Sequence, residues 1–272
     1  MAKILALAGK GGVGKTTISA AFVRILGETY PGARILAIDA DPAVGLATAL
    51  GVEVKVTLDD LRREIIDKAA AGAGKEAVEL LGEVRFRIFD ALVETEHFAF
   101  LAIGRPEGAG CYCAVNAYLK EVIDMVSKDF DYVVIDGEAG IEQINRRVME
   151  KVTHLFLVTD ASKRGFQVAR SIKKVADDLV LYEKCALLLN RVDGSKGTVL
   201  FDPLLSKMEK TESEIACGAM GEAFAEIIAV IATDPAQAEN DIWGRSIFLL
   251  PINAPVYQGA LAALNRMGIL KE

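Results

Sequence analysis

The residues best suited to chemistry form a glycine-rich loop near the start of the chain. Residues 8–17 read Ala-Gly-Lys-Gly-Gly-Val-Gly-Lys-Thr-Thr, so Gly9, Gly14, Lys15 and Thr16 fit the G-x-x-x-x-G-K-[ST] spacing of a phosphate-binding loop. Glycines leave room for successive backbone N–H groups to face a polyphosphate. A helix that begins near Lys15 adds the positive end of its dipole. We therefore expect Lys15 to reach the β- and γ-phosphates of a nucleotide and Thr16 to bind Mg²⁺.

We expect nine consecutive residues of this loop to contact the nucleotide. These are Gly9, Lys10, Gly11, Gly12, Val13, Gly14, Lys15, Thr16 and Thr17.

The elements that position this loop alternate between short apolar runs and amphipathic stretches. The apolar runs are continuous, which is typical of strands buried on both faces. They are Ile4–Ala8, Ile35–Ile38, Phe98–Ile103, Tyr132–Ile135, Leu155–Val158, Ala186–Leu189 and Ile227–Ile231. Helical patterns cover Thr17–Leu26, Leu58–Lys68 with Thr57 as N-cap and Asp60 three residues on, Val115–Val126, Arg164–Leu179 and Val256–Met267. The alternation predicts a single α/β domain over residues 1–272, with a doubly wound, mostly parallel sheet of about seven strands flanked by helices.

Composition narrows the class of protein. The 272 residues are 52% hydrophobic and 25% charged, a balance that excludes disordered and low-complexity chains. The formal net charge of −7 argues against a surface for nucleic acid. The uncharged stretch Ser246–Asn265 has the length of a membrane span but contains Pro251 and Pro255, so we expect a turn and a buried helix there. With no targeting segment, the chain is expected to be cytoplasmic, without membrane or nucleic-acid partners.

A second lysine inside the loop refines the assignment. With Lys10, the run Lys-Gly-Gly-Val-Gly-Lys-Thr-Thr resembles the deviant phosphate loop of the dimeric ATPases that include the nitrogenase iron protein and the MinD/ParA proteins. In that family the early lysine reaches the partner subunit's nucleotide. The resemblance implies a P-loop ATPase that forms a homodimer on binding ATP, in which Lys10 stabilises the charge that develops on the phosphate.

Two aspartate-bearing segments extend the resemblance. Ile38–Pro42 resembles switch I of the family, which implies that Asp39 lies in the outer shell of Mg²⁺ and that Asp41 positions or deprotonates the attacking water. Val133–Glu142 resembles a Walker B strand followed by switch II. Asp136 is then expected to hold a Mg²⁺-bound water at the ligand edge of the sheet, and Gly140 to donate its N–H to the γ-phosphate.

The adenine contacts follow from the same resemblance. Asn190 comes after an apolar run and is expected to hydrogen-bond the base, with Arg191 beside it. The loop after Ile231, including Thr233 and Pro235, is expected to line the base.

Paired cysteines carry the second informative pattern. Cys111 and Cys113 follow a glycine-rich stretch and precede a helix, whose N-terminus would lower the pKa of the thiols. Zn²⁺ and Ni²⁺ commonly take four ligands, and a two-fold dimer doubles two thiolates into four. An ordinary pair of buried thiols is the alternative. We expect Cys185 and Cys217 to be packing residues.

Together, the cysteine pair and the deviant loop resemble the CooC-type nickel-insertion ATPases of carbon monoxide dehydrogenase. The resemblance implies a dimer that binds Ni²⁺ or Zn²⁺ at Cys111 and Cys113 and uses ATP to deliver nickel to a client enzyme. Carbon monoxide dehydrogenase, acetyl-CoA synthase and another metalloenzyme are all compatible clients.

Two other functions within the family remain open. An ATP-dependent reductase like the nitrogenase iron protein would hold an iron–sulfur cluster, but Gly137–Gln143 contains no cysteine. A MinD/ParA-type positioning ATPase would use a basic C-terminal helix or a basic DNA-contacting surface. Gly259–Glu272 carries only Arg266 and Lys271 as cations, which disfavours this second function.

Overall fold

A computed structural model of the chain describes residues 2–61, 63–64, 88–104, 125–137, 151–193 and 226–270. Its strands are β1 (Lys3–Gly9), β2 (Ile35–Asp39), β3 (Val93–Glu94), β4 (Ala99–Ala102), β5 (Tyr132–Asp136), β6 (His154–Thr159), β7 (Lys184–Val192) and β8 (Glu226–Ala232). Its labelled α-helices are α1 (Lys15–Thr29), α2 (Gly45–Leu50), α7 (Lys163–Leu179), α9 (Pro235–Ile242) and α10 (Pro255–Arg266), and residues 58–61, 63–64 and 88–91 are also helical. Short 3₁₀ helices are η1 (Ser127–Asp129) and η2 (Ile247–Leu249).

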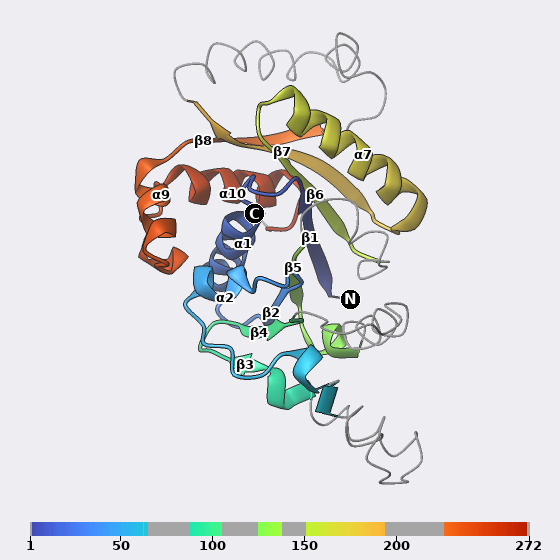
Figure 1. The fold of residues 1–272 in the computed structure, drawn as a ribbon, viewed down its shortest axis with the longest axis vertical. Helices are drawn as coiled ribbons and strands as arrows, with labels where there is room; N and C mark the ends of the chain where they lie inside the picture. The colour runs from blue at the N-terminus through green and yellow to red at the C-terminus, as the bar shows by residue number, and fades with distance from the viewer. Residues whose placement is uncertain are drawn as a thin grey trace.

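The strands form one sheet in the order β3-β4-β2-β5-β1-β6-β7-β8 (Figure 1). All neighbours are parallel except β3 and β4, which pair antiparallel. The seven predicted strands and the doubly wound α/β fold are confirmed. The eighth strand, β3, was not predicted because two residues are too few to show a hydrophobic period.

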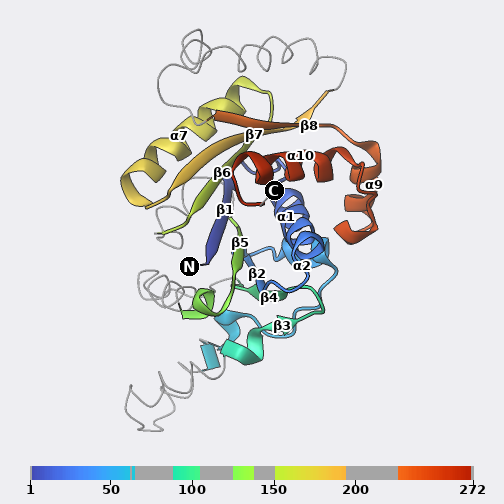
Figure 2. The same cartoon turned by 180° about the vertical axis from the view of Figure 1, so that it is seen from behind.

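Helices cover both faces of this sheet. Figures 1 and 2 show α1, α2 and α10 on one side and α7 on the other. Alternate residues of β1 serve the two sides: Leu5 and Leu7 belong to the core under α1 and α10, whereas Ala6 and Ala8 belong to the core under α7. Burial on both faces accounts for the continuous apolar runs.

Three predicted helices, α1, α7 and α10, are confirmed, with ends that differ from the prediction by up to three residues. The predicted helix Leu58–Lys68 is described only as far as residue 64, and most of Val115–Val126 lies outside the described residues. The helix after residue 57 begins with a reciprocal cap, because the Asp60 N–H donates to Thr57 Oγ1 at 3.2 Å and the Thr57 N–H to Asp60 Oδ2 at 2.9 Å. α2 and α9 were not predicted, since they contain only six and eight residues. Residues 246–265 contain η2, a turn and most of α10. Within the described parts of the chain, no helix is long and apolar enough to cross a membrane.

Arg24, on the buried side of α1, ties this helix to the segment that leads into α10. Its Nη1 donates to the carbonyl oxygens of Ile247 at 2.8 Å and Leu250 at 2.7 Å, and its Nε donates to Glu28 at 2.7 Å. The side chain is only 6% exposed. Buried carbonyls that lose their donor are costly, so Arg24 stabilises the contact between α1 and the segment that precedes α10.

Arg24→Met should lower the free energy of unfolding by about 2–4 kcal/mol, because the buried Leu250 and Ile247 carbonyl groups lose the guanidinium donor, and Ile247 retains the bond from the Leu250 N–H at 3.2 Å. Urea denaturation measures the change. Arg164→Met, at an exposed position of α7, is the control and should change stability by less than about 0.5 kcal/mol. Equal effects of the two substitutions would contradict the bracing role of Arg24.

A candidate nucleotide and magnesium site at the carboxyl edge of the sheet

The phosphate loop joins β1 to α1, as predicted. A methyl group at Gly9 would lie 2.2 Å from the Val158 carbonyl oxygen of the neighbouring strand, so only glycine lets β1 leave the sheet here. Gly12 (φ 77°) and Gly14 (φ 92°) adopt left-handed backbone conformations, and Gly14 is the N-cap of α1. The Lys15 ammonium folds back over the loop, 3.4 Å from the Lys10 carbonyl oxygen. Local backbone geometry therefore shapes an anion cradle at a helix N-terminus.

Two side chains at the end of β7 hold this loop from outside. Asn190 Nδ2 donates to the Val13 carbonyl oxygen at 2.8 Å, and Arg191 Nη1 donates to the Gly12 carbonyl oxygen at 2.6 Å. Arg191 adopts a left-handed backbone conformation (φ 56°), which is uncommon for a residue with a side chain. The predicted base-contacting pair thus also supports the loop that would hold the phosphates.

Asp39 and Asp136 lie side by side at the ends of β2 and β5, where they are register partners. Both side chains are buried. Burial, followed by the neighbouring charge of Asp136, raises the pKa of Asp39 to about 7. Burial also raises the pKa of Asp136 to about 6, although the hydroxyls of Thr16 and Ser19 and the charge of Lys15 oppose the shift. Two carboxylates in this position need a cation to be ionised together.

Asp39 uses both carboxylate oxygens to hold the loop that follows it. Oδ1 accepts from the Asp41 N–H at 3.1 Å, and Oδ2 accepts from the Leu46 N–H at 2.8 Å. Between these anchors, Val44 has φ 52°, an outlier for a β-branched residue. The loop that carries Asp41 is therefore folded around the Asp39 side chain, which suits an outer-shell role for that carboxylate.

Among the described residues, only one oxygen of the Asp136 carboxylate has a hydrogen-bond partner. Oδ1 accepts from Ser19 Oγ at 3.0 Å, whereas Oδ2 is buried and has no hydrogen-bond partner within the described residues. A buried oxygen without a partner is costly unless a ligand completes it. Carboxylate oxygens and a threonine hydroxyl suit Mg²⁺, so Asp136, Thr16 and Asp39 fit the ion that the sequence predicted.

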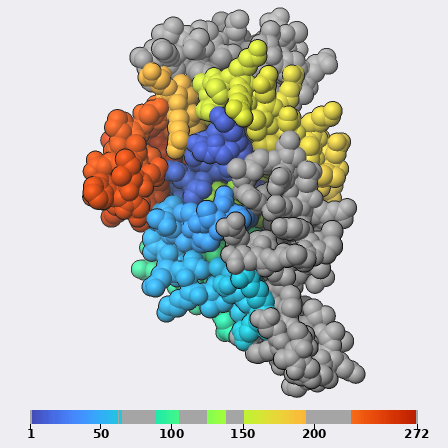
Figure 3. Space-filling view, in the orientation of Figure 1, coloured from blue at the N-terminus to red at the C-terminus, as the bar shows by residue number. Residues whose placement is uncertain are grey.

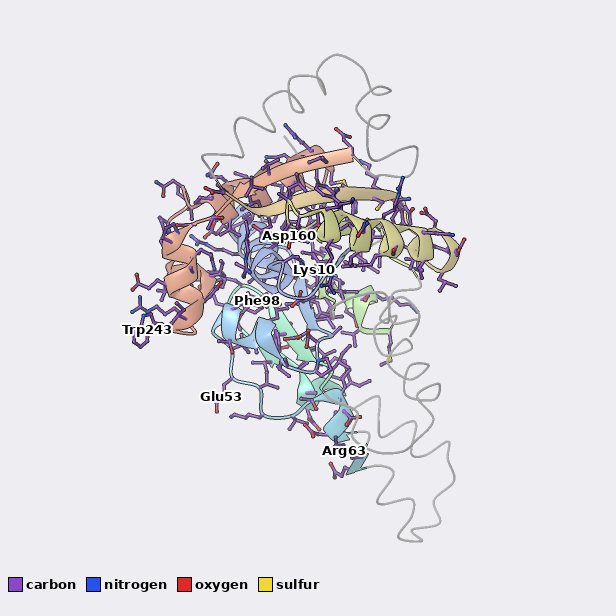
Figure 4. All side chains as sticks on the ribbon, turned by 45° about the horizontal axis from the view of Figure 1, so that its top comes forward. Lys10, Glu53, Arg63, Phe98, Asp160 and Trp243 are labelled. Carbon is purple, nitrogen blue, oxygen red and sulfur yellow. The ribbon has the colours of Figure 1, made fainter. Side chains whose placement is uncertain are left out.

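Lys10 pairs with a residue that the sequence analysis missed. Its Nζ lies 3.0 Å from Asp160 Oδ2, at the end of β6 (Figure 4). The other Asp160 oxygen accepts from the Ser162 N–H and hydroxyl, at the start of α7. Burial alone would raise the pKa of Asp160, but the hydrogen bonds from Ser162 and Lys10 lower it. Asp160 therefore presents a fixed carboxylate to Lys10.

The remaining predicted residues divide into those near this edge and those outside the described chain. The Thr233 N–H donates to the Val192 carbonyl oxygen at 2.9 Å, which sets Thr233 beside the end of β7, and Pro235 begins α9. Cys111, Cys113 and Gly140 lie outside the described residues, as does Cys217. Cys185, in β7, is partly buried against the core, as expected.

The carboxyl ends of β1, β2, β5, β6, β7 and β8 thus converge on one edge. In Figure 3 the dark-blue N-terminal part reaches the surface between light-blue residues of the α2 region, the yellow α7 region and the orange C-terminal region. Open α/β sheets bind ligands at this edge. The arrangement combines an anion cradle, a pair of buried carboxylates and the residues at the ends of β7 and β8, a set that can bind a magnesium nucleotide.

Comparison with known proteins agrees with this geometry. Residues 4–235 match the family described as "CobQ/CobB/MinD/ParA nucleotide binding domain". The chain belongs to this family. It is 36% identical over 259 residues, 94% of each chain, to an uncharacterized ATP-binding protein of Methanocaldococcus jannaschii. It is also 32% identical over 194 residues to the carbon monoxide dehydrogenase accessory protein CooC of Rhodospirillum rubrum, covering 66% of this chain and 72% of that one.

Solved structures extend the likeness in fold. The cell division ATPase MinD of Pyrococcus furiosus superimposes with a TM-score of 0.67 at 22% identity, covering 100% of both chains. MinD of Pyrococcus horikoshii, complexed with Mg-ADP, gives a TM-score of 0.64 at 21% identity, covering 98% of this chain and 96% of that one. The chain therefore has the fold of a P-loop nucleotide-binding domain.

The carboxylate pair predicts an unusual pH dependence of stability without metal. Because the pKa of Asp39 is raised to about 7, the folded protein holds a proton that the unfolded chain releases near its ordinary value of about 3.9. That stability is complete below the ordinary value and is lost as pH rises through about 7. The metal-free protein should therefore lose stability as the pH rises from about 5 to about 7 and lose little more above pH 7, and Asp39→Asn should reduce this slope.

Thermal denaturation in EDTA across this pH range measures the slope. Asp160→Asn is the control, because a lowered pKa keeps Asp160 ionised throughout and the slope should persist. A slope as steep in Asp39→Asn as in the wild type would assign the pH dependence to other groups.

Proposed function

We propose that the protein is an ATP-dependent metallochaperone: an ATPase that dimerises on ATP, binds Ni²⁺ or Zn²⁺ at a shared cysteine site and delivers nickel to a client metalloenzyme. The observation that carries the proposal is the Cys111-Tyr112-Cys113 run, in a chain that also has the second loop lysine, Lys10. The 32% identity with the carbon monoxide dehydrogenase accessory protein supports it. A carbon monoxide dehydrogenase or an acetyl-CoA synthase would be the client.

Nucleotide binding rests on the residues at the carboxyl edge. The loop from Gly9 to Thr17 surrounds the phosphates, with Lys15 across it, and Gly140 donates its N–H to the γ-phosphate. Thr16 binds Mg²⁺, Asp136 holds a water bound to it, and Asp39 lies in its outer shell; the ion would neutralise phosphate charge when bound. Adenine lies against the residues at the ends of β7 and β8: Asn190, Arg191, Thr233 and Pro235.

Dimerisation on ATP would change the partner of Lys10. In a single subunit its ammonium is satisfied by Asp160 at 3.0 Å. Reaching the nucleotide of a second subunit exchanges this carboxylate for a phosphate, which carries more charge. The ion pair is only part-buried, with the two side chains 33% and 28% exposed, so its loss costs little. Lys10 is therefore available to act on the partner's phosphate only when a nucleotide is there to receive it.

Hydrolysis is assigned to Asp41. Its backbone N–H is anchored on Asp39, and its Oδ1 accepts from the Ala43 N–H at 2.9 Å, so the side chain has a defined orientation beside the magnesium site. A carboxylate held there can orient or deprotonate the water that attacks the γ-phosphate.

Asp41→Ala should leave ATP affinity within about threefold of the wild type and reduce the hydrolysis rate by about 10²-fold or more, because only the transition state uses this carboxylate. Equilibrium binding of ATP and single-turnover hydrolysis separate the two effects. Asp178→Ala, at an exposed position of α7, is the control. Unchanged turnover in Asp41→Ala would refute the role.

Cargo binding is assigned to the cysteine pair of each subunit. Two chains together supply four sulfurs, a number that suits Zn²⁺ or Ni²⁺. Since half of the ligands come from each subunit, a change in dimer geometry after hydrolysis would weaken the site and release the metal.

The protein should bind about one Ni²⁺ or Zn²⁺ per dimer, and either Cys111→Ser or Cys113→Ser should abolish binding, because each removes two of four thiolates. Light-scattering mass combined with metal analysis, with and without ATP, measures both properties. Cys185→Ser is the matched control, since burial raises the pKa of that thiol to about 12. Wild-type protein that stays monomeric and metal-free with ATP would overturn the proposal, and iron with visible absorbance would indicate a cluster instead.

A further inference from the structure

Ser19 is a fully buried hydroxyl in the middle of an otherwise apolar stretch of α1. Its exposed fraction is 0%, and the residues that follow it, Ala20, Ala21 and Phe22, are also fully buried. A serine inside a helix commonly bonds to the carbonyl oxygen four residues earlier. Here the Ser19 hydroxyl instead donates to Asp136 Oδ1, 117 residues away, at 3.0 Å.

This bond fixes the orientation of the Asp136 carboxylate. With Oδ1 bonded to Ser19, the carboxylate cannot rotate freely, and Oδ2 is the oxygen left buried without a partner among the described residues. Thr16 lies three residues before Ser19 and therefore on the same face of α1. Both hydroxyls act on the same carboxyl group, where each favours the ionised form. One turn of α1 thus supplies two hydroxyl groups, that of Thr16 for the cation and that of Ser19 for the Asp136 carboxylate.

Packing alone does not explain a serine at this position. An alanine would fill nearly the same volume beside Ala20 and would bury no hydroxyl. A buried hydroxyl without a partner costs free energy, so the serine is favourable only because it bonds to Asp136. Groups that orient a metal-binding side chain are commonly needed for full metal affinity.

We infer that Ser19 is a positioning residue for Asp136: its hydroxyl holds Oδ1 so that Oδ2 faces the magnesium of the bound nucleotide. The inference rests on the proposed ATPase function and adds to it a residue outside the phosphate-loop motif. Ser19 does not touch the cation or the phosphates. It acts by reducing the rotational freedom of the Asp136 carboxylate, which holds the magnesium through a bound water.

The test is the Mg²⁺ concentration that half-saturates binding of a fluorescent ATP analogue, followed by anisotropy. Ser19→Ala should raise this concentration by about tenfold, because the carboxylate loses its fixed orientation. Binding of the same analogue in EDTA should stay within about twofold of the wild type, since Ser19 does not contact the nucleotide. Ser19→Thr, which keeps the hydroxyl, should restore the wild-type value. If the added methyl group prevents folding, Ser19→Cys, close in size and a weaker donor, should give an intermediate value.

The matched control is Ser127→Ala, which removes another buried serine hydroxyl, on η1, that has no partner among the described residues. It should leave the Mg²⁺ requirement unchanged. A wild-type Mg²⁺ requirement in folded Ser19→Ala would overturn the inference and leave the proposed function standing. Wild-type binding that is absent, or indifferent to Mg²⁺, would instead overturn the magnesium site itself and the proposed function with it.

Discussion

Two carboxylates buried side by side constrain the rest of this structure. Asp39 and Asp136 are register partners at the ends of adjacent strands, and no rearrangement of β2 and β5 could separate them without breaking the centre of the sheet. Burial raises the pKa of each, to about 7 and about 6. Like charges at this distance are tolerated in proteins where a bound cation is part of the functional state. The fold therefore holds in place a pair that a divalent ion with nucleotide would complete.

The groups around Asp39 and Asp136 fix the orientation of the two carboxylates. Backbone N–H groups of Asp41 and Leu46 converge on Asp39, so the loop that carries Asp41 takes its shape from that carboxylate. Ser19 fixes one oxygen of Asp136 and leaves the other free. α1 connects these parts, because it begins at the phosphate loop, carries Ser19 one turn later and is bonded through Arg24 to η2 and to Leu250, in the segment that leads into α10. Displacement of α1 would thus disturb the phosphate cradle and the magnesium site together.

Much of this arrangement could be read from local sequence. The seven main strands could be predicted from continuous apolar runs, because each strand is buried on both faces. The phosphate loop could be predicted from the spacing of glycines and lysine in residues 9–16, because the backbone geometry of the loop requires glycine at those positions. β3, α2 and α9 were not predicted because each is too short for a hydrophobic period to be recognised in its sequence. The partners of the site were out of reach for another reason. Lys10 and Asp160 are bonded although 150 residues separate them in the sequence, and Ser19 and Asp136 are bonded across a separation of 117 residues. Only the order of the strands in the sheet brings these partners together.

The central claim is that the buried carboxylates receive the magnesium of the nucleotide, and proton release tests it most directly. Calorimetric titration of preformed Mg·ATP at about pH 6.5, in buffers of different ionisation enthalpy, counts the protons exchanged on binding. Because Mg²⁺ would restore the ionised forms of Asp39 and Asp136, the account predicts release of about one proton per chain, most of it absent in Asp39→Asn. Binding heats that do not vary with the buffer would contradict it.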